Sequence, residues 1–473
     1  MHELLVCSHR GPVSYTASTA GVQLKPAGVG GLVVGVAAAI ERLGGTWVFA
    51  SASAREAELA QLAPGGIEQE GVNYQPLGLP RAAHQDHYAT ISSELLMPLF
   101  LRMLPTSGQP VFTERARRAW DGYRLVNSIY AEAIRFRDCA AVLVEDLHLM
   151  LVAAAVRRHG PGRLADVPLS YFHHVPWCSA DYFGQLPAQI RLEILRGLLA
   201  FDSVGFHCRR WAEAFWACCE RYVPGVGRTG DIITRQGHQT RLVASPVAVD
   251  AGRLARMADS PVALEWRRRF REGTGARKLI VRVERADPAK NTVRGLHAYA
   301  KLLDRRPQLA EETCLLAVLT RNRTWIPAYR RYLDQCFRTA AVINRRFPSA
   351  PVFLHLGEDA EDRDQHRALG ALAIASTVMA TSVYDGFNLV AMEAMMVGAA
   401  PSLVLSQNTG AQARLGPHAF VVNPFDISGT SGAIERSIDE AAPQRIARVT
   451  ALREIIAAHT PSDWIRDRLA GLG

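Results

Sequence analysis

The chain has 473 residues, of which 48% are hydrophobic and 21% are charged. Because a domain typically has ~100–200 residues, this length allows two globular domains with full cores. No apolar run reaches the roughly 18 residues that a membrane-spanning helix needs. The N-terminus begins Met1-His2-Glu3 and lacks the basic start of a secretory signal. These features argue against a membrane or secreted protein, and we expect a cytoplasmic one.

The formal net charge is +9 and the pI is about 9.3, a balance that favours anionic partners. The basic residues are dispersed along predicted helices, without a long Lys/Arg block that is interleaved with aromatic residues. This distribution favours a phosphorylated small molecule over nucleic acid, although solvated Arg-rich helix faces explain the charge equally well. The eight cysteines form no CxxC pair. They indicate reduced thiols and no disulfide framework or zinc site.

Apolar β-type runs alternate with helical segments along the chain, which predicts an α/β fold with parallel sheets. Helices are expected over Gly31–Leu43 and Trp120–Phe136, among others. The adjacent pair Cys218-Cys219 is expected to lie on a further helix. The strands predicted in the first half are Leu4–Ser8, Thr46–Ala50, Ala141–Val144, Leu169–His173, Ser203–Phe206 and Arg241–Ala244.

A proline-containing segment, Ser245–Asp250, interrupts this alternation and predicts a linker. We therefore expect two Rossmann-like domains, residues 1–247 and 248–455. A last helix, about Ser462–Leu469 within residues 456–473, is expected to cross back to the first domain. The strands predicted in the second half are Lys278–Val283, Thr313–Leu319, Val352–Leu356, Ser376–Ala380, Pro401–Leu405 and Ala419–Val422.

The stretch after Ser376–Ala380 is the most informative part of the sequence. A tight Asp385-Gly386 turn follows the buried strand, and Asn388 then opens a helix that carries Glu393. A helix N-terminus offers free N–H groups and a partial positive charge, which suit an anionic or polyhydroxyl ligand. The two carboxylates add acceptors for sugar hydroxyls.

Charged residues follow other predicted strands, at the carboxyl edge where ligands bind in open α/β sheets. Arg285 and Lys290 together can neutralise a diphosphate leaving group. Arg10 and Arg323 can clamp a phosphate monoester, and Asp146 can accept a hydrogen bond from a hydroxyl. We see no carboxylate pair placed to hold a metal ion, and therefore predict no metal site.

Two weaker candidates, the glycine cluster and His174, have both a functional and a structural interpretation. The glycines of Gly28-Val29-Gly30-Gly31 would let a phosphate approach backbone N–H groups, but a flexible loop explains them as well. His174 follows a strand as a site residue would, and also as a histidine that only bonds locally would. We expect His148 to be structural, on a helix that begins there.

Ordered motifs along the chain resemble those of the trehalose-6-phosphate synthase family, a family of retaining glycosyltransferases. The resemblance runs from Ser8 to about Asp426. It implies a GT-B fold, with two Rossmann-like domains that face each other across a cleft. The motifs that carry it are SHRGPVSY, GVGGL, AWDGYRLVN, VEDLHLM, FHHVPWCSADYFGQLP, VGFH, VERADPAKN, SVYDGFNLVAMEA and VVNPFD.

The resemblance also implies roles for individual residues. The residues that match catalytic positions of the family are Asp146, His174, Arg285 and Lys290. The residues that match the acceptor site are Arg10, Tyr88, Met97, Asp146 and Arg323. The residues that match the nucleotide-sugar site are Gly30, Gly31, Arg285, Lys290, Asp385, Gly386, Phe387, Asn388, Leu389 and Glu393. The implied reaction moves glucose from UDP- or GDP-glucose to glucose 6-phosphate with retention, giving trehalose 6-phosphate. It requires no metal or other cofactor.

The chain departs from the family pattern at four places. Met97-Pro98 stands where the family has Trp-Pro, and Glu145 and Leu147 change the family motif VHDYHL to VEDLHL. The loop Ala286–Ala289 and Met392 also differ. The last three departures partly resemble pseudo-glycosyltransferases, which join a nucleotide-linked cyclitol to an aminocyclitol phosphate.

Three hypotheses therefore stay open. The first is the glucosyl transfer just described. The second is another transfer, either by a pseudo-glycosyltransferase that forms a C–N bond or to an acceptor such as glycerol 3-phosphate. The third is a silent module that binds sugar phosphates. The sequence leaves a homo-oligomer open.

Overall fold

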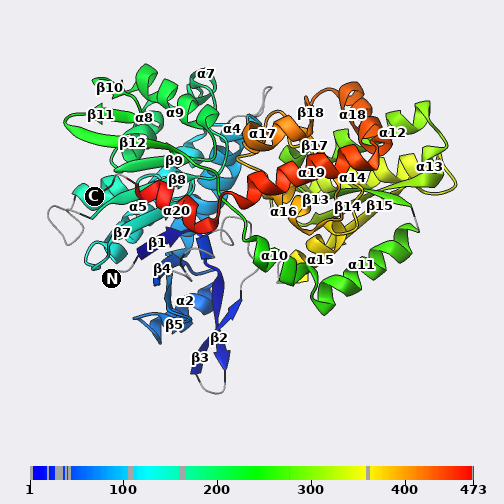
Figure 1. The fold of residues 1–473 in the computed structure, drawn as a ribbon. Helices are drawn as coiled ribbons and strands as arrows, with labels where there is room; N and C mark the ends of the chain where they lie inside the picture. The colour runs from blue at the N-terminus through cyan, green and yellow to red at the C-terminus, as the bar shows by residue number, and fades with distance from the viewer. Residues whose placement is uncertain are drawn as a thin grey trace. The chain divides into compact units, whose positions relative to one another are not determined.

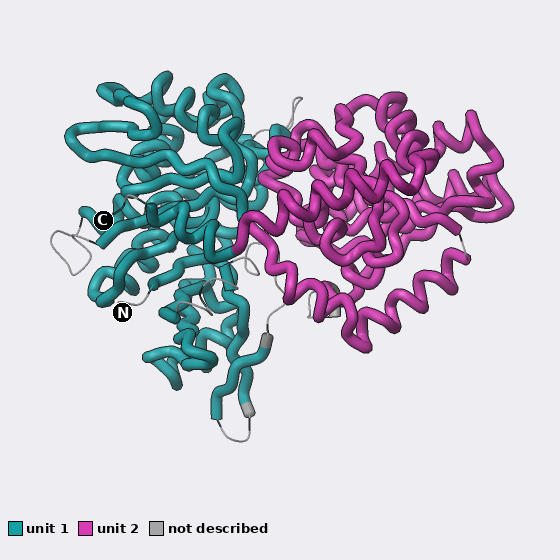
Figure 2. Tube along the Cα trace, in the orientation of Figure 1, with its two compact units in different colours: residues 1–247, 461–473 teal, residues 248–460 magenta. Residues whose placement is uncertain are grey.

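The chain forms two compact units in the computed structural model, residues 1–247 with 461–473 (unit 1) and residues 248–460 (unit 2) (Figures 1 and 2). Gly30, Gly31 and most of the predicted helix Gly31–Leu43 lie outside the described residues. The structure describes residues 4–18, 21–26, 36, 37, 40, 44–104, 111–158, 167–275, 277–357, 363–470 and 472.

Unit 1 is built on a ten-stranded sheet in the order β10-β11-β12-β9-β8-β7-β1-β4-β6-β5. Every residue of β1, β4, β7, β8 and β9 is buried, as expected for parallel strands that are covered on both faces. The parallel strands are β1 (Leu4–Ser8), β4 (Gly45–Ala50), β6 (Val72–Leu77), β7 (Ala141–Glu145), β8 (Leu169–His173), β9 (Ser203–Phe206) and β12 (His238–Ala244).

Several strands of unit 1 were absent from the sequence prediction. The sheet edges are antiparallel, formed by β5 (Ile67–Gln69), β10 (Val226–Thr229) and β11 (Ile232–Arg235), and a separate hairpin pairs β2 (Val13–Ser18) with β3 (Gly21–Pro26). The described residues of these strands are mostly half-buried or exposed and include many polar residues. They therefore lack the apolar run by which buried strands were recognised.

Two helix predictions in unit 1 need correction. Helix α5 begins at Glu114, earlier than the predicted Trp120, because the Thr113 side chain caps it by accepting a hydrogen bond from the backbone N–H of Ala116. His148 does not begin a helix. It lies in a turn that includes a backbone hydrogen bond from Leu149 N–H to Asp146 O, and α6 begins only at Val152.

The helices of unit 1 include the pair Cys218-Cys219 on α9, as predicted, with both thiols buried. The last helix, α20, belongs to this unit and buries Trp464. The bounds are α2 (Ala54–Gln61), α3 (Arg81–His84), π-helical η1 (Gln85–Leu96), α4 (Met97–Phe100), α5 (Glu114–Ile134), α6 (Val152–Arg158), α7 (Ala180–Phe183), α8 (Ala188–Leu198), α9 (Arg209–Tyr222) and α20 (Pro461–Leu469).

Unit 2 is built on a six-stranded parallel sheet in the order β15-β14-β13-β16-β17-β18. All six strands predicted for the second half are present, with ends shifted by at most two residues. They are β13 (Lys278–Arg285), β14 (Thr313–Thr320), β15 (Val352–Gly357), β16 (Thr377–Ala380), β17 (Ser402–Ser406) and β18 (Phe420–Val422).

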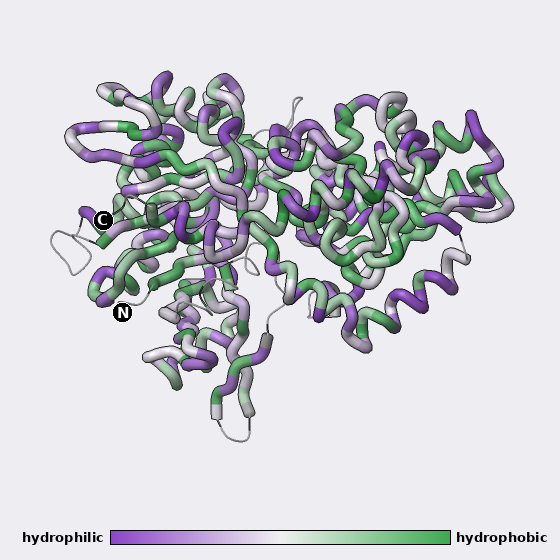
Figure 3. Tube along the Cα trace, viewed as in Figure 1, coloured by the Kyte–Doolittle hydropathy of each residue, from purple (hydrophilic) through white to green (hydrophobic). Residues whose placement is uncertain are grey.

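Helices cover this sheet, and α12, α14 and α18 bury apolar residues against its strands. Hydrophobic residues gather along the strands, whereas much of α11 is hydrophilic (Figure 3). No described helix is both long enough and apolar enough to cross a membrane. The bounds are α10 (Ala251–Ala258), α11 (Pro261–Thr274), 3₁₀-helical η2 (Pro288–Lys290), α12 (Thr292–Arg305), α13 (Leu309–Glu312), α14 (Pro327–Asn344), α15 (Arg363–Leu372), α16 (Leu389–Val397), α17 (Gln412–Leu415), η3 (Gly416–His418), α18 (Ile427–Asp439) and α19 (Ala442–Ala457).

Candidate active site

Buried side chains fix the loop after β1. Trp47 Nε1 donates to Ser8 Oγ (2.8 Å), and Ser8 Oγ donates to the carbonyl oxygen of Arg10 (2.6 Å). The hydroxyl of Tyr130 donates to the carbonyl oxygen of Ser8 (2.8 Å). Arg10 itself is exposed, and its guanidinium donates to the hydroxyl of Tyr88 on η1 (2.9 Å). The structure thus brings together two residues that the sequence assigned to the acceptor phosphate.

A cluster of histidines surrounds His9 next to this pair. The His9 ring stacks on Tyr88 and on His148, with ring centroids 4.5 and 4.7 Å apart, and His84 and His87 lie 5.3 and 5.4 Å away. Burial lowers the pKa of His9 well below its ordinary value, and the neighbouring histidines lower it further. At neutral pH His9 is therefore uncharged. Sequence reasoning missed this cluster because its members come from separate segments.

Tyr88 and Met97 share one continuous helical stretch. Tyr88 lies on η1, and Met97 begins α4 immediately after it. Such π-helical geometry is rare in proteins and is often found at functional sites. Met97 is 7% exposed, so its side chain packs in the interior of unit 1.

Asp146 and His174 lie together at the ends of β7 and β8. Asp146 Oδ1 accepts a hydrogen bond from the backbone N–H of His174 (3.2 Å). The backbone of Asp146 is left-handed, with φ of 68°, a conformation that Asp tolerates better than most residues. Burial raises the pKa of Asp146, an effect that His174 partly opposes.

Glu145 links His174 to the C-terminal helix. The Glu145 side chain is fully buried; its Oε2 lies 2.6 Å from His174 Nε2, and its Oε1 accepts from the Arg468 guanidinium (2.5 Å). Burial alone would raise the pKa of Glu145, but Arg468 and His174 outweigh it and hold this pKa below its ordinary value. Because an ionised carboxylate only accepts hydrogen bonds, His174 Nε2 carries the proton in this contact.

Arg468 is itself enclosed by unit 1. It is 1% exposed, and its guanidinium carbon lies 5.2 and 5.0 Å from the ring centroids of Phe172 and Trp464. Sequence reasoning missed this residue. One signal was present in the sequence, because Glu145 replaces a histidine of the VHDYHL motif and a buried carboxylate needs a cationic partner. Nothing in the motif showed that this partner lies on the C-terminal helix.

In unit 2, Lys290 forms an ion pair with the Asp385 turn. Asp287 caps η2 by accepting from the backbone N–H of Ala289 (3.0 Å), and this places Lys290. Lys290 Nζ then donates to Asp385 Oδ2 (2.6 Å), which also accepts from the Ser382 hydroxyl (3.2 Å). These residues lie at one edge of the sheet. Arg285 ends β13 at that edge, with an exposed side chain.

The loop that carries Asp385, Gly386 and Phe387 is held by the segment after β17. The N–H of Asp385 donates to the carbonyl oxygen of Asn408 (3.2 Å), and the N–H of Ala411 donates to that of Phe387 (3.0 Å). Helix α16 begins at Leu389, with Asn388 as its left-handed N-cap (φ 78°), so the prediction that Asn388 opens a helix is confirmed.

Behind Lys290 lies a buried ion pair that sequence reasoning missed. Arg282 contacts Glu284 (2.9 Å), the hydroxyl of Thr381 (2.8 Å) and the carbonyl oxygen of Lys290 (2.8 Å). A Cβ added at Gly295 would lie 2.2 Å from the Arg282 guanidinium, so a larger residue at this position would displace that group. Because Arg282 also donates to the carbonyl oxygen of Lys290, the Arg282–Glu284 pair fixes the backbone at Lys290.

Arg323 lies after β14 in unit 2, whereas Arg10 belongs to unit 1. The Arg323 guanidinium is 3.8 Å from Asp287 Oδ2, and the residue is 8% exposed. Its φ of 44° is unusual for arginine. Such backbone strain is found more often at functional sites than elsewhere.

Glu393 lies on α16 and is half-buried. Burial raises the pKa of its carboxyl group to about 7. Near neutral pH the side chain is therefore divided between its protonated and ionised forms. Among the described residues, no cluster of His, Cys, Asp and Glu has the arrangement of a metal site.

The model of glycosyltransferase family 20 matches residues 2–472. The chain belongs to glycosyltransferase family 20. It is 29% identical to the trehalose-6-phosphate synthase of Mycolicibacterium vanbaalenii, over 99% of this chain and 96% of the relative. It is 30% identical to the trehalose-6-phosphate synthase of Mycobacterium bovis, over 99% of this chain and 95% of that one.

A solved structure is similar along its whole length. It is a UDP-forming alpha,alpha-trehalose-phosphate synthase from Burkholderia xenovorans in complex with glucose 6-phosphate, with a TM-score of 0.83 and 25% identity over 99% of each chain. The family and this similarity show that the protein is a glycosyltransferase with the GT-B fold, as the motifs implied.

Proposed function

We propose that this protein transfers glucose from UDP-glucose to glucose 6-phosphate with retention, giving trehalose 6-phosphate and UDP. The similarity to curated trehalose-6-phosphate synthases over 99% of the chain is the observation that carries the proposal. The Burkholderia xenovorans relative is named UDP-forming, which favours uracil over guanine in the donor, and it was solved with glucose 6-phosphate.

Unit 2 supplies the groups that we assign to the nucleotide sugar. Arg285 is exposed and Lys290 is part-buried, and two cations are the complement that a diphosphate needs. Lys290 now bonds Asp385, so binding would exchange this carboxylate for phosphate oxygens. Asp385 would then be free to accept hydrogen bonds from the glucose hydroxyls. We assign Glu393 to the ribose. The remaining donor contacts that we propose are Gly30, Gly31, Gly386, Phe387, Asn388 and Leu389.

The proposed acceptor contacts are held mainly by unit 1. Arg10 and Tyr88 already contact each other and would bind the phosphate of glucose 6-phosphate together with Arg323 of unit 2. Asp146 would accept a hydrogen bond from an acceptor hydroxyl. The buried Met97 replaces a family tryptophan in this region, which makes the acceptor the substrate to test first.

The proposed step needs no protein nucleophile. The anomeric hydroxyl oxygen of glucose 6-phosphate forms a bond to C1 of the transferred glucose, on the face from which the diphosphate departs. The C1–O bond to the diphosphate breaks, and its electron pair stays with the diphosphate, which also takes the hydroxyl proton. Arg285 and Lys290 stabilise the negative charge that develops on the leaving group, a contribution typically worth a factor of about 10² or more. His174 and Asp146 orient the glucose and the acceptor.

A donor-by-acceptor matrix tests the proposal. Purified protein is incubated with UDP-, GDP- or ADP-glucose and with glucose 6-phosphate, glycerol 3-phosphate or an aminocyclitol phosphate, and nucleoside diphosphate release is recorded. We expect release with UDP-glucose and glucose 6-phosphate, matched by an α,α-linked disaccharide phosphate. Release confined to another acceptor would overturn the assignment in favour of a different transfer. Nucleotide binding without release from any pair would indicate a silent module.

A further inference from the structure

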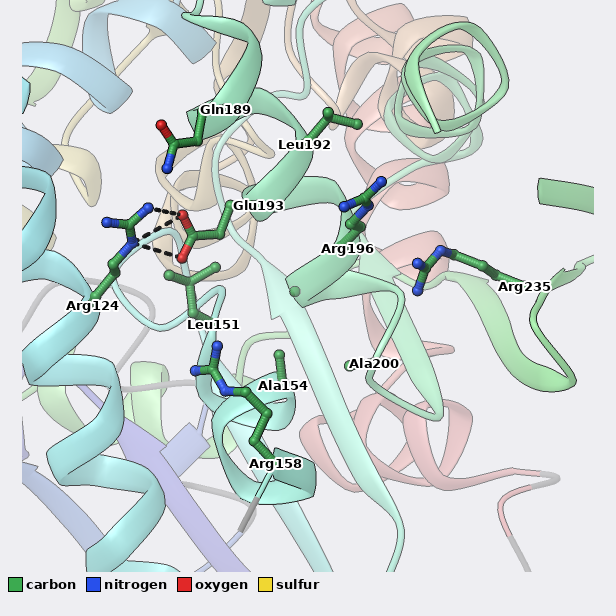
Figure 4. A pocket seen from close by; sticks show the side chains of 11 residues that line it. Arg124, Leu151, Ala154, Arg158, Gln189, Leu192, Glu193, Arg196, Ala200 and Arg235 are labelled. Atoms are coloured by element: carbon green, nitrogen blue, oxygen red, sulfur yellow. Dashed lines mark hydrogen bonds and ion pairs between the residues drawn. The ribbon is translucent and has the colours of Figure 1, made fainter. Parts of the chain in front are cut away.

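Unit 1 contains a cavity of about 650 Å³ that is lined by none of the proposed substrate contacts. It lies where α5, α6, α8 and β11 meet, and its lining includes four arginines, Arg124, Arg158, Arg196 and Arg235, but only one acidic residue, Glu193. In Figure 4, Arg158 extends toward the Arg124–Glu193 pair and Arg235 points toward Arg196.

The Glu193 carboxylate already has partners of its own. It bonds Arg124 through both carboxylate oxygens, at 2.8 and 2.6 Å, and also accepts from Trp120 Nε1 (2.9 Å). Among the described residues, no carboxylate pairs with the other three arginines of the cavity. Other surface arginines of this chain do have such partners, for example Arg268 with Glu265 and Arg306 with Asp439. The cavity therefore holds an excess of positive charge.

Arg235 and Arg196 show the consequence of this imbalance. Burial and the neighbouring Arg196 both lower the pKa of Arg235, although the group stays charged. Arg235 Nε is buried and has no hydrogen-bond partner among the described residues. A buried donor beside a second cation, without an acceptor, costs free energy that a bound anion would recover.

We propose that this cavity is a binding site for a phosphorylated small molecule. Guanidinium groups present planar pairs of donors that match phosphate oxygens. The volume lies within the ~300–1,000 Å³ range of small-molecule sites. Leu151, Ala154 and Leu192 add an apolar wall for the body of such a ligand. The proposal is independent of the transferase activity, because it uses a different set of residues.

The test measures binding of inorganic pyrophosphate and of fructose 1,6-bisphosphate to the full chain by calorimetry at low salt. Since the proposed substrate site also binds phosphates, the parent protein is an Arg10→Gln/Lys290→Gln variant. Adding Arg196→Gln/Arg235→Gln is expected to weaken the remaining binding tenfold or more. A matched control, Arg330→Gln/Arg331→Gln, removes the same charge from exposed positions of α14 and is expected to change it less than twofold.

Two outcomes would overturn the proposal: no binding left in the parent variant, or binding that the cavity and control variants weaken equally. Arg196→Glu offers a variant that is safe for folding because Arg196 is exposed, and it should abolish the same binding. A stronger effect on the bisphosphate than on pyrophosphate would identify an organic phosphate as the occupant, and the reverse would identify a free phosphate. Both support an anion site, and both are distinct from failure of the transferase assay.

Discussion

Two ion pairs near the proposed site, one in each unit, lie in different environments. In unit 1, Glu145 and Arg468 are 0% and 1% exposed, and the pair sits behind His174. In unit 2, the side chains of Lys290 and Asp385 are 20% and 16% exposed. Both pairs join a carboxylate to a cation, but the Glu145–Arg468 pair is shielded from water, whereas the Lys290–Asp385 pair stays partly hydrated.

This difference indicates that the two ion pairs have different roles. A fully buried ion pair is rigid, and removing one partner leaves an uncompensated charge in the interior. Such a pair suits the fixed orientation of His174. A part-hydrated pair can exchange a carboxylate for a ligand phosphate at low cost. Mutation of the Glu145–Arg468 pair should therefore act mainly on stability, and mutation of the Lys290–Asp385 pair mainly on activity.

The largest effect is expected for Arg468→Met. Glu145 would stay buried without its cation, and loss of one partner from a buried pair typically costs about 3–5 kcal/mol of stability. Urea unfolding of the variant measures this loss. The double variant Glu145→Gln/Arg468→Met should lose less than Arg468→Met alone, since no unpaired charge remains. A loss below about 1 kcal/mol would show that the comparison between the units is wrong.

The stability gap between wild type and Arg468→Met should also depend on pH. In the folded protein the pKa of Glu145 is held below its ordinary value of 4.5. Its contribution to stability is therefore complete above about pH 4.5 and is lost as the pH falls through the folded-state pKa. We expect the gap to shrink in acid, as measured by thermal unfolding. A gap that widens in acid would contradict the role given to the ionised Glu145.

Lys290→Ala tests the partly hydrated pair of unit 2. We expect turnover to fall at least about 10²-fold, because the diphosphate loses one of its two cations. Stability should change by no more than about 1 kcal/mol, the upper range for a part-exposed pair. Nucleoside diphosphate release and urea unfolding of the same preparation measure the two effects. Unchanged turnover would refute the role of Lys290.

Arg323→Ala should have a smaller and selective effect. Loss of one charge-assisted hydrogen bond to the acceptor phosphate predicts an increase of about tenfold in the KM for glucose 6-phosphate, with the KM for UDP-glucose changed much less. Arg321→Ala, an exposed arginine two positions earlier, is the matched control. If Arg323→Ala instead weakened nucleotide binding selectively, the acceptor assignment would be wrong.

The smallest effect is expected for Glu393→Gln. The folded-state pKa of Glu393, about 7, lies above its ordinary value of 4.5, so the folded protein binds this proton more tightly. The stability that this proton contributes is present at low pH and is lost as the pH rises toward about 7. The neutral glutamine avoids that loss, so the variant should gain stability relative to wild type as the pH rises. Thermal unfolding from pH 5 to pH 8 would show no such trend if Glu393 were hydrated.

The sequence predicted some parts of this molecule well because local patterns determine them. Most strands of unit 2 contain a run of apolar residues, as in Leu279–Val281 of β13 and Cys314–Leu319 of β14, and strands that are buried on both faces typically contain such a run. The helix start at Asn388 follows from its place after the Asp385-Gly386 turn. The hairpin β2–β3 was missed because its mostly part-exposed residues form no apolar run.

The partners of the site residues could not be predicted in the same way. Arg468 contacts Glu145 across more than 300 positions of the chain, and no local pattern records such a contact. The histidines around His9 likewise come together only when β1, α3, η1 and the turn after β7 are in place. What the motifs did supply was the set of residues at the strand ends, since the parallel topology gathers those residues at one edge.

The most direct test of the central claim is a single assay of the wild-type protein with UDP-glucose and glucose 6-phosphate in the presence of excess EDTA. Because Arg285 and Lys290 are proposed to neutralise the leaving diphosphate, UDP release should continue at an undiminished rate when metal ions are removed. The product should be the α,α-linked disaccharide phosphate. UDP release that stops with EDTA and returns with Mg²⁺, or a product of another linkage, would contradict this account.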